Sequence, residues 1–432
     1  MFRKLIIITL CIILLTSFQS AIGHSQSNSA IENSQIKNSS FNPDIITMIN
    51  KINQSILSGY LEKIVSFGIR FVGTENCRKA SEYLNEEFQN LGLDSYIDSW
   101  RYPKYKCQNV IATLNGTDPT SDAVIVLTAH LDTTKNSVGA NDDGSGVAVI
   151  LTIANITSKY HFNHTIKFVI FSGEERGCYG SFDYAKKAYN RNENIISNIN
   201  LDSIGNSTCG NIVQARVSKR SFQLYYYFKE ITEKFGNFIN MQVQLTANTL
   251  IDSQPFIDYG YDAISLVQPK FLEYPFHTPQ DTLDKINYPY FENVTKVILA
   301  TVVELAEKEI DVQVRFVTPK EGYIYLFNIP ILRLPGFNIY NTGLRGMTYL
   351  IGRSIARVNI TTEEEIVDVI FSIDGNANFE GMKTKPPYEF KIKKSRMQLF
   401  RLRGKHKLGV YVCTSSGKTA YDEMDFYALK PI

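Results

Sequence analysis

Cysteine is scarce in this chain of 432 residues, which contains only six. Cys11 lies in an N-terminal apolar run, and the other five are Cys77, Cys107, Cys178, Cys209 and Cys413. None of them has Cys-x-x-Cys spacing, which argues against a thiolate zinc site. Five is an odd number, so at least one thiol stays unpaired or pairs between chains. A disulfide between Cys178 and Cys209 is one expectation, and buried free thiols are the alternative.

An excess of charge of one sign is also missing. The chain has 45 Lys and Arg against 43 Asp and Glu, and loss of Arg3 and Lys4 with an N-terminal segment would leave 43 of each sign. No nucleic-acid partner is therefore implied. The composition, 44% hydrophobic and 20% charged, is that of a folded protein, and the length favours two domains.

The N-terminus lacks an apolar run long enough to cross a membrane. The run from Leu5 to Leu15 follows Arg3 and Lys4 and is shorter than the ~20 residues of a spanning helix. With the small-x-small pattern Ala21-Ile22-Gly23, it predicts a signal peptide over residues 1–23, and an uncleaved anchor is the alternative. Residues 24–42 are rich in Ser and Asn and predict a flexible leader.

Export is also consistent with eight Asn-x-Ser/Thr sequons. We expect a secreted, extracellular protein without stable membrane insertion after cleavage, and association with the cell surface is a further option. The sequence does not define an oligomeric state.

From residue 43 to about 310, helical and strand patterns alternate. One helical stretch runs from Pro43 to about Phe67, and a second from about Thr74 to the stop at Gly92. Apolar strands are expected at Asn109 to Leu114, Ala123 to Ala129, Ile166 to Ser172, Ile196 to Leu201 and Ala263 to Val267. This pattern predicts an α/β domain with a mixed, mostly parallel central sheet flanked by helices.

Residues 311–432 have a different pattern of short alternating segments separated by Gly, Pro, Asn and Lys turns. It predicts an all-β domain, a small antiparallel sandwich. The terminal run from Gly404 to Asp425 resembles bacterial and archaeal immunoglobulin-like modules. We expect this domain to be an accessory module.

Five candidate metal ligands occur in short motifs along the α/β region. They are His130 in Ala129-His130-Leu131-Asp132, Asp142 in Gly139-Ala140-Asn141-Asp142-Asp143-Gly144, Glu175 in Ser172-Gly173-Glu174-Glu175, Asp202 in Asn200-Leu201-Asp202, and His277 in Phe276-His277-Thr278-Pro279. Each motif alone would fit an ordinary turn, cap or strand end. Together they give each of two divalent ions three protein ligands if one carboxylate, assigned to Asp142, bridges.

These motifs lie at or just beyond the carboxyl ends of the predicted strands, where open α/β sheets place their sites. Three carboxylates, two divalent ions and a bridging hydroxide carry no net charge, so a dry pocket could hold the cluster. Without metal, the neighbouring carboxylates should take up protons or disorder the loops around them.

Two further carboxylates are candidate catalytic residues. Glu174 is adjacent to Glu175, so one of the pair is expected to bind metal while the other takes a proton from metal-bound water and returns it to the departing amine. Asp132 lies two residues after His130 on a strand, and its carboxylate could accept the second N–H of the imidazole. The histidines His24, His161, His164 and His406 are expected to face solvent.

With these motifs in view, the chain resembles the M28 family of zinc aminopeptidases from Gly73-Thr74-Glu75 to the segment Tyr290 to Leu305. The resemblance implies His130 and Asp202 on one zinc, Glu175 and His277 on the other, Asp142 bridging and Glu174 as general base. It also implies a possible cis peptide between Asp142 and Asp143.

The chain departs from the family at two places. Some members have a tyrosine before the last histidine to stabilise the oxyanion, whereas this chain has Phe276, and Tyr274 is a candidate substitute. The family's Ser-Asp-His-x-Pro-Phe motif reads Asp252-Ser253-Gln254-Pro255-Phe256 here. Both departures bear on substrate handling.

We therefore expect a secreted dinuclear zinc exopeptidase that acts on peptides, most simply an aminopeptidase, with cobalt or manganese as alternative metals. Glutaminyl-cyclase-like acyl transfer and carboxypeptidase activity on the same fold are the enzymatic alternatives. A non-catalytic binding module is the alternative from another class, although such proteins usually lose ligands and all five are present here.

Overall fold

A computed structural model of the protein describes residues 43–102, 105–217, 221–246, 251–308, 312–334, 348–362, 364–374, 376–383, 385–392, 404–415 and 418–429. The signal peptide expected at 1–23 and the leader expected at 24–42 lie outside the described residues. Within the described part of the chain, no helix has both the length and the apolar character needed to span a bilayer.

The helices of the α/β region begin at recognisable caps. Asn53 and Thr74 each accept a hydrogen bond from a backbone N–H of the first turn that follows. The single helical stretch expected from Pro43 to Phe67 is wrong, because the cap at Asn53 starts a second helix. The α-helices are α2 (Pro43–Ile49), α3 (Gln54–Val65), α4 (Glu75–Asn90), α5 (Gly144–Thr157), α6 (Tyr179–Asn190), α7 (Phe222–Lys234), α8 (Ser253–Asp258) and α9 (Tyr288–Glu307).

An eight-stranded mixed sheet forms the centre of this region, in the order β1-β2-β4-β3-β5-β8-β6-β7. Its strands are β1 (Asp94–Tyr102), β2 (Tyr105–Leu114), β3 (Ala123–His130), β4 (Thr165–Phe171), β5 (Asn194–Leu201), β6 (Ile212–Val217), β7 (Gln242–Thr246) and β8 (Ala263–Val267). The strands β4, β3, β5 and β8 run parallel, as expected, whereas β1, β2 and β6 add antiparallel pairings. The strands β1, β6 and β7 were not predicted.

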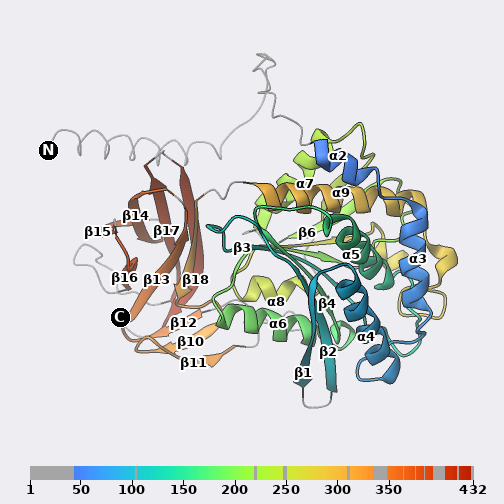
Figure 1. Cartoon of the computed structure of the whole chain (residues 1–432). Coiled ribbons are helices and arrows are strands. Elements are labelled where there is room, and N and C mark those ends of the chain that lie inside the picture. The colour runs from blue at the N-terminus through green and yellow to red at the C-terminus, as the bar shows by residue number, and fades with distance from the viewer. Residues whose placement is uncertain are drawn as a thin grey trace, which may run out of the picture. The chain divides into compact units, whose positions relative to one another are not determined.

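Both faces of the sheet are covered by helices (Figure 1). Alternate residues of β3 point to opposite faces, so Ile125 and Leu127 pack with α3, α4, α5 and α9, while Val124 and Val126 pack with α6 and α8. The nearly continuous apolar character of β3 and β4 follows from this burial on two sides. The expected α/β class is confirmed.

The region from residue 312 is all-β. A seven-stranded sheet has the order β11-β10-β12-β18-β17-β14-β15, and a three-stranded sheet has the order β16-β13-β9. The strands are β9 (Gln313–Thr318), β10 (Tyr323–Leu326), β11 (Ile329–Arg333), β12 (Thr348–Ile351), β13 (Ser354–Thr361), β14 (Ile366–Ile373), β15 (Asn376–Lys383), β16 (Glu389–Ile392), β17 (Gly404–Thr414) and β18 (Thr419–Ala428). Residues from both sheets share one apolar core.

This β region differs from the sandwich expected from the sequence in its pairing. The strand β12 pairs in parallel with both β10 and β18, so the larger sheet is not purely antiparallel. The strands β11, β12 and β15 were not predicted. The immunoglobulin-like assignment stays a prediction.

Expectations about two histidines and one pair of cysteines are wrong. The His406 side chain is 15% exposed rather than solvent-facing, with Nδ1 at 2.8 Å from Asp374 Oδ2. His161 is exposed as expected, and His24 lies outside the described residues. His164 is buried rather than solvent-facing, with Nδ1 at 2.7 Å from Ser121 Oγ and Nε2 at 2.6 Å from the Lys308 carbonyl oxygen. Cys178 Sγ contacts Glu174 Oε1 at 3.7 Å and Cys209 is a separate, partly exposed thiol, so the expected pairing of these two cysteines is not found.

Candidate metal centre

The five expected ligands come together at the carboxyl ends of the central strands. His130 ends β3, Asp202 follows β5, and Glu175 lies in the short 3-10 helix η1 (Glu174–Arg176) that follows β4. Asp142 lies in the loop before α5, and His277 lies between the 3-10 helices η3 (Phe271–Glu273) and η4 (Leu283–Lys285). Segments from across the sequence therefore meet because parallel strands end at one edge of the sheet.

The ligand atoms form two groups that share Asp142. In the first, His130 Nε2 lies 3.2 Å from Asp142 Oδ1 and 4.0 Å from Asp202 Oδ1. In the second, His277 Nε2 lies 3.2 Å from Asp142 Oδ2 and 2.8 Å from Glu175 Oε2. One oxygen of Asp142 thus faces each imidazole, which is the geometry that a bridging carboxylate requires.

The donors in these groups fit divalent zinc. Each group combines one imidazole nitrogen with two carboxylates, a donor set that zinc accepts. Within the described part of the chain, His130 Nε2 and Glu175 Oε1 are buried without a hydrogen bond of acceptable geometry. A buried polar atom without such a bond is costly, and coordination of a cation would remove that cost.

The pKa values of the ligand residues are shifted in ways that favour the binding of cations. Burial raises the pKa of Glu175 and Asp202, and their carboxylate neighbours raise it further. Burial also acts to raise the pKa of Asp142, but the two imidazoles outweigh burial and hold that pKa below its usual range. Burial acts to lower the pKa of His277, and Asp142 and Glu175 outweigh it and raise the pKa to about 10. Cation binding would therefore displace protons from the cluster.

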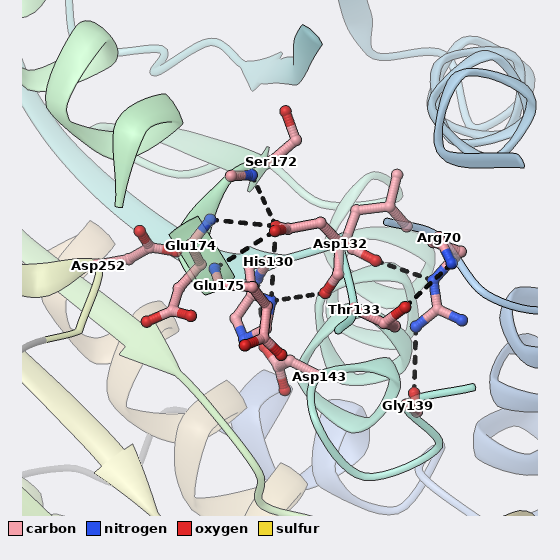
Figure 2. A network of polar contacts seen from close by, with 12 residues as sticks. Arg70, His130, Asp132, Thr133, Gly139, Asp143, Ser172, Glu174, Glu175 and Asp252 are labelled. Carbon is pink, nitrogen blue, oxygen red and sulfur yellow. Dashed lines mark hydrogen bonds and ion pairs between the residues drawn. The ribbon is translucent and has the colours of Figure 1, made fainter. Parts of the chain in front are cut away.

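Asp132 is placed as expected, but its partners differ from the expectation. The imidazole Nδ1 of His130 lies 3.0 Å from the backbone carbonyl oxygen of Asp132 and 3.8 Å from its carboxylate. The carbonyl therefore orients the ring. The carboxylate instead accepts hydrogen bonds from the backbone N–H groups of Gly173, Glu174 and Glu175, at 2.7, 3.1 and 3.3 Å (Figure 2). Asp132 thus holds the loop that carries both glutamates.

Arg70 supports the loop that follows Asp132. Its fully buried guanidinium donates to the carbonyl oxygens of Leu131, Val138 and Gly139 at 2.8, 2.7 and 3.1 Å, and more weakly to those of Ile64 and Gly68. Figure 2 shows this group on the far side of Asp132 from the glutamates. Burial lowers the pKa of Arg70 to about 10, against the favourable charge of nearby carboxylates.

Asp143 caps a helix and does not join the metal groups, as expected. Its carboxylate accepts from the backbone N–H groups of Gly146, Ser203 and His130, at 2.9, 3.1 and 3.2 Å, and so joins the start of α5 to two ligand segments. The expected cis peptide between Asp142 and Asp143 is confirmed.

Asp281 and Tyr274 hold the backbone of the loop that carries Asp142. The carboxylate of Asp281 accepts from the backbone N–H groups of Asn141 and Asp142 at 2.8 and 3.0 Å, and the Tyr274 hydroxyl donates to Asp281 at 2.8 Å. Tyr274 therefore does not fill the role of oxyanion donor for which it was a candidate. At the mouth of the site, Phe276 contacts the His277 ring and stacks on Phe271.

Glu174 lies beside the metal ligands with its own set of neighbours. Burial raises its pKa well above the usual range, and the nearby carboxylates Asp252, Asp202 and Glu175 add to the shift. The Cys178 thiol donates to Glu174 Oε1 at 3.7 Å, and Ser181 Oγ donates to Asp252 Oδ1 at 2.5 Å. Figure 2 shows Asp252 next to Glu174, on the side away from Arg70.

Sequence reasoning missed Arg70, Asp281, Asp252 and Cys178. Arg70 and Asp281 lie 60 or more residues from the loops they support, as the separations of their hydrogen bonds show, and no local motif joins them. Asp252 falls in the segment already noted as a departure from the family, which was a usable signal. Cys178 follows Glu174 by four residues, but the 3-10 helix ends between them, so no helical spacing indicates their contact.

Comparisons with known proteins agree with this geometry. The model of Peptidase family M28 matches residues 109–302. Aminopeptidase YwaD of Bacillus subtilis is 28% identical over 212 residues, or 47% of this chain and 45% of that protein. A probable zinc metalloprotease of Leptosphaeria maculans is 25% identical over 333 residues, 61% of this chain and 77% of that protein. The chain thus spans less than half the length of the Bacillus relative.

Solved structures share the fold. A zinc aminopeptidase of Bacillus subtilis superposes with a TM-score of 0.53 at 18% identity, covering 60% of this chain and 96% of that one. A glutaminyl cyclase of Bacteroides thetaiotaomicron superposes with a TM-score of 0.52 at 19% identity, covering 58% and 98%. The segment that matches the model of Peptidase family M28, residues 109–302, contains all five ligands.

Proposed function

We propose that this protein is a secreted dinuclear zinc exopeptidase, an aminopeptidase that hydrolyses N-terminal peptide bonds. The observation that carries the proposal is the pair of ligand groups that share Asp142, each with one histidine and a second carboxylate. The names of the sequence relatives, an aminopeptidase and a probable zinc metalloprotease, support the same reaction class.

In this mechanism, His130 and Asp202 would hold one cation, Glu175 and His277 would hold the other, and Asp142 would contribute to both groups. Bound cations would supply Lewis-acid polarisation of the scissile carbonyl and would lower the pKa of a water molecule. Glu174, adjacent to Glu175, would accept a proton from the attacking water and pass it to the departing amine. Asp132 keeps Glu174 in place through its three backbone hydrogen bonds.

The test is a panel of aminoacyl fluorogenic substrates, assayed with zinc content measured in parallel. We expect two zinc ions per chain and turnover on substrates with a free N-terminal amine. Glu174→Gln should keep both ions and lower kcat by roughly 10²–10⁴-fold, because only the proton acceptor is lost. Glu62→Gln, at an exposed position on α3, is the matched control. Full activity of Glu174→Gln would mean that the base is misassigned.

The same measurements separate the rival reactions. The glutaminyl cyclase found among the fold neighbours makes cyclisation of N-terminal glutamine the specific alternative. A metal content near one ion per chain, with a cyclised product and no released amino acid, would favour the cyclase. Cleavage only from the C-terminal end of a peptide would favour a carboxypeptidase.

We assign residues 43–310 to the peptidase domain and residues 311–432 to an accessory β domain. The support is that both described metal-ligand groups come from residues 130–277. Deletion of 311–432 should leave turnover of small aminoacyl substrates within about twofold of the full chain. Collapse of that turnover in a truncated protein that stays folded by circular dichroism would contradict an accessory role.

A further inference from the structure

Two cysteines that the proposed mechanism does not use lie together in the core. Cys77 is in the first turn of α4, and Cys107 is in β2. Their side chains are 0% and 7% exposed, and their Sγ atoms are 3.6 Å apart. Thirty residues separate them in the sequence. Cys178, in contrast, contacts Glu174, so the described cysteines are not equivalent.

We propose that Cys77 and Cys107 form a disulfide bond when this protein folds in an oxidising compartment. The disulfide goes beyond the proposed reaction and relies only on the export part of that proposal. An S–S bond is ~2.0 Å long, so the two sulfur atoms must approach by roughly 1.5 Å, which small side-chain rotations can provide. Exported proteins meet the oxidants that make such bonds persist.

The chemistry needs a disulfide oxidant, such as oxidised glutathione or a dithiol oxidoreductase. The Cys107 thiolate attacks one sulfur of the oxidant and releases one thiol, and a mixed disulfide forms. Cys77 then loses its proton, attacks Cys107 Sγ and releases the second thiol, so two hydrogens and two electrons pass to the oxidant. Because both side chains are buried in the final fold, this reaction takes place late in folding, when the two thiols are already in contact and the oxidant can still reach them.

Cys107 is suited to the first step. The hydrogen bond from Cys77 lowers the pKa of Cys107 to about 6, in spite of an opposing effect of burial. The same contact and burial raise the pKa of Cys77 well above its usual range. One sulfur is therefore the nucleophile and the other is the resolving thiol.

The crosslink would join α4 to the part of β2 that supports the glutamate loop. Gln108, next to Cys107, accepts a hydrogen bond from Ser172 Oγ at 2.6 Å through its carbonyl oxygen. Trp100 Nε1 donates to Asn109 and Ser172 at 3.1 and 3.2 Å. Ser172 directly precedes Gly173, the first residue of the loop held by Asp132. The disulfide would thus hold in place the part of β2 that supports this loop, and we expect it to increase the stability of the folded protein.

The decisive experiment counts thiols in the full chain after refolding with reduced and oxidised glutathione. The protein is denatured in an alkylating reagent, and its mass is measured with and without prior reduction. We expect three alkylated cysteines besides Cys11 before reduction and five after it, with one peptide pair joining Cys77 to Cys107. Five alkylated cysteines before reduction, or a different pair, would overturn the proposal.

A stability measurement adds a second readout. Reduction with a phosphine should lower the melting temperature of the wild-type protein by roughly 5–10 °C, as expected for loss of a crosslink around a 30-residue loop. Cys413→Ser, a partly exposed position in β17, should show the same drop, and Cys77→Ser with Cys107→Ser should show none. An unchanged wild-type melting temperature after verified reduction would contradict the stabilising role. Neither readout requires peptidase activity, so failure of the proposed function would be recognised separately.

Discussion

The two regions of this chain bury different kinds of side chain. In the α/β region, buried ionisable residues gather at one end of the sheet, including His130, Asp132, Asp142, Asp143 and Asp202. In the described part of the β region, Asp422 is the one acidic or basic residue that is buried, and the other buried residues are apolar or neutral, such as Tyr325 and Thr348. Both regions have an apolar interior, and the α/β region holds the acidic cluster in addition to it.

The difference shows where the protein buries ionisable groups at a cost in folding free energy, and this is at the proposed functional site. Burial of an ionised group is unfavourable unless hydrogen bonds or an opposite charge compensate for it. Asp422 is compensated within the β region, because it accepts from the Phe316 backbone N–H at 2.9 Å. The metal-ligand groups keep buried oxygen and nitrogen atoms without such compensation. Buried atoms without a hydrogen bond also occur in the β region, for example Ser354 Oγ and Gln313 Oε1, so the functional site is marked by the gathering of several buried ionisable groups at one place.

Metal removal should produce the largest difference between the two regions in stability and in hydrogen exchange. Chelation should abolish turnover and lower the melting temperature of the α/β region, because like charges are left within 4.8 Å of one another. At saturating zinc, the stabilisation lost is about 4 kcal/mol if the ion exceeds its Kd ~1,000-fold. Hydrogen exchange should quicken in residues 130–145 and 172–178, while exchange in β17 and β18 stays unchanged. Unchanged exchange and melting after chelation would contradict a metal-stabilised site.

The sequence predicted what local motifs and strand periodicity encode. His130, Glu175 and Asp202 stand out because they lie at or after the end of a strand, Asp142 because it lies in a glycine-rich loop, and His277 because of its motif with Thr278 and Pro279, and the structure brings all five together. The central strands β3, β4 and β8 were predicted because two-sided burial makes them mostly apolar, and β5 was predicted although buried Ser and Asn residues interrupt its apolar pattern. Edge strands such as β1 and β7 were missed, since exposed positions interrupt their pattern.

The sequence could not predict the contacts that support the ligands. Asp132 was expected to orient His130 through its carboxylate, but the backbone carbonyl does so and the carboxylate binds N–H groups some 40 residues away. Such partners depend on loop conformations that no spacing rule gives. Arg70 is a stronger example, because its role depends on carbonyl groups, which carry no side-chain signature.

Substitution of two arginines tests the comparison at single positions. Arg70→Met should destabilise the metal-loaded protein by about 3 kcal/mol or more, because five carbonyl oxygens lose their buried donor. Arg357→Met is the matched control in the β region. Its guanidinium pairs with Glu389 while 54% exposed, so we expect a loss below about 1 kcal/mol. Urea unfolding of both variants measures the difference, and equal losses would remove the contrast between the regions.

The pH dependence of the stability of the metal-free protein tests the comparison at a single buried carboxylate, Asp252. Burial raises the pKa of Asp252 to about 6 in the folded protein, above the 3.8 of an exposed carboxyl. The folded state therefore binds more protons than the unfolded state between these values. The stability from this group is complete below about 3.8 and is lost as the pH rises through 6. The melting temperature of the chelated wild-type protein should fall over this range.

Asp252→Asn should make that fall less steep, because the amide does not titrate and its oxygen can still accept from Ser181. Asp94→Asn, at an exposed position on β1, is the control and should keep the wild-type slope. Curves for Asp252→Asn and wild type that stay parallel from pH 4 to 7 would mean that Asp252 is ionised in the folded protein. In that case Asp252 would be a buried negative charge beside Glu174 in the metal-free protein. Such a charge would need a nearby cation even when the ligand groups hold no metal. The contrast with Asp422, whose carboxylate is compensated by a hydrogen bond, would then no longer hold at this position.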